Sequence, residues 1–172
     1  MVSQLNIRKP FTSWGRGFAN TVVYHHGYED RIPKYAFKLI LWKQGPSASD
    51  TQTPQQDLSF WISTKATMGI KVNGIHIKSH QGNQPLTASK EWGELRHEDE
   101  ITIWTKENKT NLYIKFIFNC YIGASRAQRQ HDITPFSILP KSEARDELDG
   151  YCLQAELKAL ARKKRKTRRR GK

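Results

Sequence analysis

Hydrophobic and polar residues alternate along the chain between about positions 18 and 120. Leu112, Ile114, Phe116 and Phe118 occupy every second position, and Lys115 and Asn119 lie between or beside them. Successive side chains of a strand point to opposite faces, so a period of two predicts a strand with one buried face. The same alternation predicts further strands around Phe37–Leu41, Leu58–Ile62 and Ile101–Ile103.

Two shorter segments, Ala19–His25 and Ile70–Val72, also favour strands because they are rich in β-branched or aromatic residues. Asn73–Gly74 follows directly and is typical of a tight hairpin turn, since both residues tolerate a positive φ. Many short strands separated by turn residues predict an all-β sandwich or barrel.

The composition changes after Cys120. Residues 123–140 are typical of a linker, and the following segment predicts a helix in which leucines recur from Leu148 to Leu160. Ser142 is a suitable N-cap, and acidic residues follow it in the first turns. We therefore expect a sandwich domain over residues 1–122, a linker over 123–140, a helix over 141–162 and a basic, disordered tail over 163–172.

The net charge of +13 is concentrated at the C-terminal end. Nine of the 29 Lys and Arg residues lie in residues 162–172, which contain no acidic residue, so the rest of the chain carries only +4. Lys163, Lys164, Arg165 and Lys166 resemble a nuclear import signal, which predicts a nuclear protein, and the same run could bind the phosphate backbone of nucleic acid. No aromatic residue interrupts the run, so base stacking is not predicted there. A non-specific solubilising extension is the remaining alternative.

Several functional classes are disfavoured. No apolar stretch is long enough for a membrane span, and two distant cysteines, Cys120 and Cys152, indicate a reducing compartment rather than a disulfide framework. No phosphate-binding Gly-rich loop, nucleophile elbow or kinase motif is present, and the histidines do not have the spacing of a metal site. We therefore expect no catalysis, no metal and no cofactor.

Four short motifs then occur in a recognisable order. They are Gly15-Arg16, the segment Pro33–Leu39, the segment Ser63–Gly74 and the segment Leu95–Ile103. This order resembles the forkhead-associated (FHA) domain, whose pattern is G-R, S-x-x-H, S-[ST]-N-G-T-x-x-N-G and L-x-x-G-D-x-I-x-I. The resemblance covers about residues 10–120 and implies a sandwich of about eleven strands.

The resemblance also implies a site for phosphothreonine peptides on loops at one end of the sandwich. By position, Arg16 would be the main phosphate donor, Lys34 a second cation and Thr67 a hydroxyl donor, and Met68 would lie against the peptide. The loops would be braced by Gly15, Gly69, Asn73 and Gly74. Three positions depart from the family pattern, because Pro33, Ala36 and Met68 replace its Ser, His and Asn.

We therefore expect a phosphothreonine-binding interaction module of nuclear signalling, similar to the FHA module of checkpoint-type kinases but without their kinase domain. Its partner would be a phosphothreonine-containing protein, and the divergent positions would weaken or alter peptide selection. The alternative is a nucleic-acid-associated protein that binds through the basic tail, with the sandwich as a scaffold. A third hypothesis is a purely structural domain that binds a protein through a sheet face.

Overall fold

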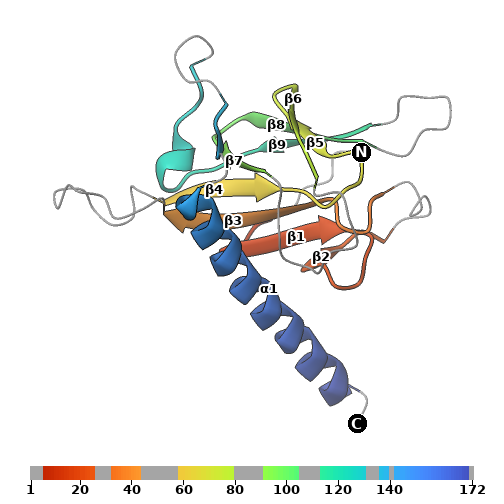
Figure 1. Cartoon of the computed structure of the whole chain (residues 1–172). Coiled ribbons are helices and arrows are strands. Elements are labelled where there is room, and N and C mark those ends of the chain that lie inside the picture. Colours follow the sequence, from red (N-terminus) through yellow and green to blue (C-terminus); the bar gives the residue numbers. More distant parts are fainter. Residues whose placement is uncertain are drawn as a thin grey trace, which may run out of the picture.

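The computed structural model describes residues 6–25, 32–43, 58–79, 91–104, 113–130, 136–139 and 142–170. These residues form two β-sheets, a short 3₁₀ turn η2 and one long helix (Figure 1). The strands are β1 (Phe11–Gly15), β2 (Val22–Val23), β3 (Phe37–Lys43), β4 (Leu58–Ser63), β5 (Ile70–Val72), β6 (Ile75–Ile77), β7 (Trp92–Leu95), β8 (Asp99–Trp104), β9 (Tyr113–Phe118) and β10 (Ile138–Leu139); η2 spans Ala124–Arg126 and helix α1 spans Glu143–Arg170.

The strands are arranged as a sandwich, as the sequence predicts. One sheet has the order β10-β7-β4-β3-β1-β2 and the other has the order β6-β5-β8-β9. Strand β1 pairs with β2 in parallel, and every other described pair is antiparallel. The described residues contain ten strands, and the resemblance implies about eleven.

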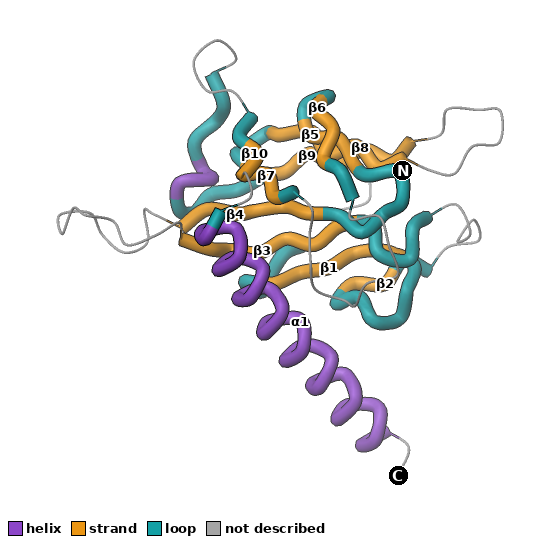
Figure 2. The backbone as a smooth tube through the Cα atoms, viewed as in Figure 1, coloured by secondary structure: helices purple, strands orange, loops and turns teal. Residues whose placement is uncertain are grey.

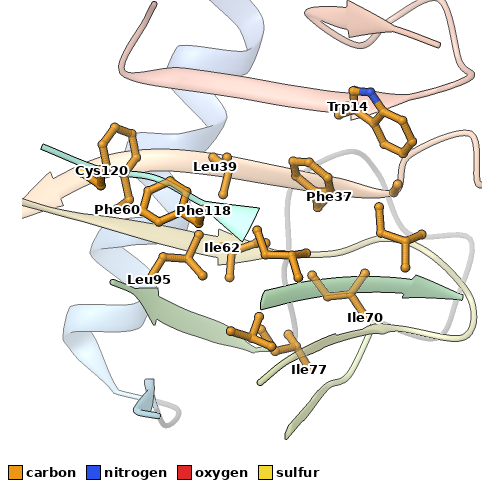
Figure 3. Packing of buried hydrophobic residues seen from close by; sticks show 14 of the residues in the cluster. Trp14, Phe37, Leu39, Phe60, Ile62, Ile70, Ile77, Leu95, Phe118 and Cys120 are labelled. Atoms are coloured by element: carbon orange, nitrogen blue, oxygen red, sulfur yellow. The ribbon is translucent and has the colours of Figure 1, made fainter. Parts of the chain in front are cut away.

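The core between the sheets is formed by the strand faces that the alternation predicts. Leu39 lies opposite Ile62 in the β3–β4 pair, and both side chains are almost completely buried. Ile101 lies opposite Phe116 in the β8–β9 pair, and both belong to the same cluster. Figure 3 shows these inner faces meeting, with the aromatic ring of Phe60 beside that of Phe118 at a centroid distance of 5.4 Å.

The predicted hairpin at Asn73–Gly74 is confirmed. Strands β5 and β6 pair with Val72 opposite Ile75, and the two turn residues have φ values of 50° and 81°. Positive φ at both central positions is the geometry that an Asn-Gly pair favours.

The expected linker over residues 123–140 is wrong for its described parts, residues 123–130 and 136–139, and its remaining residues lie outside the described parts of the chain. Ser125 is fully buried and its hydroxyl accepts a 2.8 Å hydrogen bond from the backbone N–H of Phe60. Strand β10 adds an edge to the six-stranded sheet by pairing with β7. Arg129 forms a buried ion pair with Asp99, at 2.9 Å from Nε to Oδ1. A polar composition suggested a linker, but these polar groups satisfy buried partners of the sandwich, which therefore extends beyond residue 122.

The expected helix boundary is also wrong, because α1 continues through the basic run to Arg170. Ser142 caps it as predicted, with its hydroxyl accepting from the N–H of Arg145 at 3.4 Å. Gly150 does not interrupt it. Lys and Arg have high helix propensity and their positive charges suit a helix C-terminus, which explains how the helix extends through the segment expected as a tail.

Helix α1 covers the outer face of the six-stranded sheet (Figure 2). Leu148 and Cys152 are fully buried against Trp42, Trp61 and Trp92, and the helical alanines Ala144, Ala155 and Ala159 pack against the same cluster. The side of the helix that docks on the sheet therefore consists largely of small residues. The recurring leucines of the sequence do not all face the sheet, since Leu157 is 53% exposed. The indole Nε1 of Trp92 donates a 2.7 Å hydrogen bond to Asp149 and fixes the helix to the sheet.

Candidate functional site

Three loops emerge from one end of the six-stranded sheet. Trp14 at the end of β1 pairs with Phe37 at the start of β3, and Lys38 pairs with Ser63 at the end of β4. The residues that follow or precede these positions, 16–21, 32–36 and 64–69, therefore lie at the same end (Figure 1). We call these three segments the loop rim.

The first two loops of the rim are joined by their backbones. The N–H of Arg16 donates to the carbonyl of Pro33 at 3.2 Å, and the N–H of Gly17 donates to that of Lys34 at 3.0 Å. A Cβ atom at Gly15 would lie 2.5 Å from the carbonyl oxygen of Lys34. Only glycine allows this approach, which places Arg16 beside Lys34.

A buried asparagine clamps the same two loops. The Nδ2 of Asn20 donates hydrogen bonds of 2.8 Å to Gly17 O and 2.6 Å to Lys34 O, and the residue is 1% exposed. Sequence analysis did not select Asn20, because an asparagine between two strands is common and only its burial distinguishes it. Its role here is to hold the backbones of the rim together.

Arg16 brings a guanidinium to the rim. Its Nε donates a 2.8 Å hydrogen bond to the carbonyl oxygen of Ile32, which orients the group and uses one of its five donors. Among the described residues, no carboxylate forms an ion pair with Arg16. The terminal nitrogens of a half-buried guanidinium therefore keep donors for an anion.

The third loop is fixed to the second by a threonine. The hydroxyl of Thr64, which is 1% exposed, donates to the carbonyl of Ala36 at 2.5 Å and accepts from the N–H of Ala66 at 3.0 Å. Thr67 and Met68 follow on an exposed turn, and Met68 is 60% exposed. The rim thus presents the Thr67 hydroxyl, the exposed Lys34 and the half-buried Arg16. Among the described residues, no hydrogen bond joins the side chains of these three residues.

Gly69 closes that turn. Its N–H donates to Ala66 O at 2.8 Å, its φ is 73°, and an added Cβ would lie 2.3 Å from Nε2 of His76. The same Nε2 donates to the carbonyl of Met68 at 2.9 Å. His76 therefore supports the turn from strand β6, a role that sequence analysis did not foresee.

Two positions of the family pattern carry no anion-binding side chain here. Pro33 contributes only its carbonyl oxygen to the rim, and Ala36 is fully buried with its N–H bonded to Trp14 O at 2.9 Å. The carbonyl oxygen of Ala36 accepts the bond from Thr64, which holds this position of the second loop against the third.

Asn73 and Gly74 lie at the end of β5 away from the rim. The amide of Asn73 donates to Asp99 Oδ1 at 2.7 Å and accepts from the N–H of Glu100 at 2.8 Å. Asp99 is the same carboxylate that pairs with Arg129. Asn73 therefore braces the β5–β6 turn against β8 and has no part in the rim itself.

Lys163 connects the basic helix to the rim. Its Nζ donates to the carbonyl oxygens of Phe18, at 2.9 Å, and of Asn20. Partial burial lowers the pKa of Lys163. The other residues of the basic motif, Lys164, Arg165 and Lys166, are exposed on the helix.

Within the described parts of the chain, no group of three or more His, Cys, Asp or Glu side chains is arranged to hold a metal ion. Cys120 and Cys152 are both buried free thiols. Among the described helices, none combines the length and hydropathy that a bilayer span requires.

No protein-family model and no curated protein matches this chain. Its structure is similar to the solution structure of the FHA2 domain of Rad53 in complex with a phosphotyrosyl peptide derived from Rad9. The TM-score is 0.52 over 82% of each chain, with 13% sequence identity. The fold is therefore FHA-like, as the resemblance of the motifs implies.

Proposed function

We propose that the loop rim binds phosphothreonine-containing peptides and that the protein is an interaction module rather than an enzyme. One observation carries the proposal: the rim places Arg16, free of carboxylate partners among the described residues, on a backbone joined to that of Lys34. A phosphate ester carries about −1.5 to −2 charges and three acceptor oxygens, and it is bound best by a guanidinium together with further donors.

The side chains of the rim have separable roles in this proposal. Arg16 donates to the phosphate from a guanidinium that its bond to Ile32 O has already oriented. Lys34 adds a second positive charge and Thr67 adds a hydroxyl donor, both from exposed positions. Met68 offers an apolar side chain where the family has an amide, so we expect the residues that flank the phosphothreonine to be selected by apolar contact rather than by amide hydrogen bonds.

The structural neighbour supports a phosphopeptide ligand, because that FHA2 domain is in complex with one. Its peptide is phosphotyrosyl, whereas the motifs of this chain resemble a phosphothreonine pattern. The identity of the phosphorylated residue is therefore a variable that the experiment must include.

We further propose that this binding takes place in the nucleus. Support comes from the exposed cations Lys164, Arg165 and Lys166, which remain accessible although Lys163 contacts the rim. Replacing these three residues with glutamine and following a fluorescent fusion in cells tests the import role separately from peptide binding.

The test of the proposed function is a binding assay on the full chain with degenerate peptides that contain phosphothreonine, phosphotyrosine or unmodified threonine. We expect selective retention of the phosphothreonine set, and a loss of at least about tenfold in affinity with Arg16→Gln, which removes a charge-assisted contact. Arg126→Gln is a matched control, because Arg126 is exposed on η2 rather than in the rim. Equal binding of modified and unmodified peptides would contradict the proposal, and preference for phosphotyrosine would correct its specificity.

A further inference from the structure

A groove of about 710 Å³ lies between helix α1 and the start of strand β1. Its lining comes from Lys9–Phe11, from Thr21 and from helix residues between Tyr151 and Lys166. Apolar groups contributed by Pro10, Phe11 and two helical alanines line part of it. Thr21 is the one groove residue that also belongs to the loop rim, whereas Arg16, Lys34, Thr67 and Met68 do not line the groove. Ligand binding in the groove is therefore independent of phosphothreonine binding at the rim.

The lining of the groove is strongly cationic. Six of its lining residues are basic and none is acidic. Lys158, Arg162 and Lys166 follow one another at a spacing of four residues on the helix, so their charges lie on one side and repel one another. Among the described residues, none of these three forms an ion pair with a carboxylate. Binding of a polyanion would relieve this repulsion.

The helical wall of the groove is held in position by contacts at several points along its length. Ala155 and Ala159 pack against the buried cluster on the outer face of the six-stranded sheet. Lys163 donates to the carbonyl oxygens of Phe18 and Asn20. The cations therefore stand on a docked helix rather than on a loose chain. A ligand that binds to preordered side chains loses less conformational entropy than one that must order a flexible segment.

We propose that this groove binds the sugar-phosphate backbone of single-stranded nucleic acid. A cationic wall that follows the helix suits a chain of phosphates, and the apolar floor suits unpaired bases and sugars. Tyr151 lines the groove and is 47% exposed, so it offers an aromatic face that the basic sequence run itself lacks. A duplex hides its bases from such a floor, and an acidic peptide has no bases to place there.

The test compares two double variants of the full chain that remove the same charge from the same helix. Lys158→Gln with Arg165→Gln changes two groove residues, and Lys164→Gln with Arg168→Gln changes two residues that do not line the groove. All four side chains are exposed, so both proteins should retain the wild-type helical signal. Fluorescence anisotropy with a labelled oligothymidine of about 20 nucleotides is measured over a range of salt concentrations, with the matched duplex and poly-glutamate as competitors.

We expect the groove variant to lose at least about tenfold in affinity and its log–log salt slope to fall by about 1.4, the value for two lost contacts to a single strand. The control variant should remain within about threefold of wild type. Tyr151→Ala should weaken the oligothymidine complex by at least about fivefold because stacking is lost. Equal losses in the two double variants would overturn the proposal in favour of unspecific charge attraction. If poly-glutamate bound more tightly than the oligothymidine, the groove would be assigned to an acidic peptide. If the duplex bound more tightly than the oligothymidine, that result would also contradict the proposal.

Discussion

The hydroxyl of Thr64 donates a 2.5 Å hydrogen bond to the carbonyl oxygen of Ala36. This bond joins the loop that carries Thr67 to the loop that carries Lys34. Ala36 in turn donates its N–H to Trp14 O, at the end of the strand that leads to Arg16. These two hydrogen bonds, which meet at Ala36, therefore couple the positions of all three loops of the rim.

Thr64→Val removes this hydroxyl while keeping the shape of the side chain. It leaves a buried carbonyl without its donor, so we expect a loss of about 1–3 kcal/mol in the free energy of unfolding and weaker phosphopeptide binding. Thr67→Val is the matched control, because Thr67 is exposed and should change stability by less than about 0.5 kcal/mol while still weakening binding. Denaturant unfolding and peptide titration measure both quantities; unchanged stability in Thr64→Val would refute the coupling.

Gly15→Ala tests the close approach of the first two loops. The added Cβ would meet backbone oxygens of Pro33 and Lys34 at 2.8 and 2.5 Å, so the loops must separate. We expect destabilisation of about 1–3 kcal/mol from overpacking and a loss of phosphopeptide affinity. Gly150→Ala should instead stabilise the protein by about 0.5–1 kcal/mol, because its Cβ meets no atom within 4 Å and alanine favours the helix. A neutral Gly15→Ala variant in thermal unfolding would contradict the described loop contact.

Leu148→Ala tests the docking of helix α1. Leu148 is fully buried between the helix and the outer face of the six-stranded sheet, and its truncation should reduce the free energy of unfolding by about 2–5 kcal/mol. Leu157→Ala, on an exposed position of the same helix, should change it by less than about 0.5 kcal/mol. Similar effects of the two substitutions would show that the helix does not dock through the side that carries Leu148.

The Cys152 thiol reports on the same contact. Burial raises its pKa from an ordinary value of about 9 to about 11, which favours the neutral thiol in the folded protein. Above the unfolded pKa the unfolded chain loses a proton that the folded chain keeps, so stability should fall as pH rises from about 9 to 11. Cys152→Ala should flatten this part of the curve of unfolding free energy against pH.

The alkylation rate of Cys152 at mild alkaline pH gives an independent readout. We expect it to be slow in the wild type, because the thiol is buried and neutral, and faster in Leu148→Ala, where the helix is loosened. Rapid labelling of the native protein at this residue would contradict a docked helix.

The inner faces of the sandwich could be predicted from sequence because alternation depends only on which positions are apolar. The burial of the outer face of the six-stranded sheet could not be predicted in this way. Ile40 and Trp42 occupy the opposite face of β3 and are buried only because α1 covers them. The covering stripe contains Ala155 and Cys152, and such small residues give a weak hydrophobic signal although they allow a helix to lie close to a tryptophan-rich sheet.

The candidate site, like the fold, could be predicted from the sequence only in part. The order of the motifs placed Gly15, Arg16 and Lys34 on neighbouring loops, since the spacing of short motifs survives when residues between them change. The residues that hold the loops together, Asn20 and Thr64, act through side-chain bonds to backbone carbonyls. Such bonds depend on distances between segments remote in sequence, and an isolated asparagine or threonine does not reveal them.

The most direct test of the account is a titration of ¹⁵N-labelled full chain with a phosphothreonine peptide selected from the library, followed by amide chemical shifts. We predict saturable shifts at Arg16, Gly17, Lys34 and Thr67, and none at Asn73 or Gly74, and we expect the titration of Arg16→Gln to give an affinity at least about tenfold weaker. Shifts confined to the Asn73 turn or helix α1, or an unchanged affinity in Arg16→Gln, would contradict phosphate binding at the loop rim.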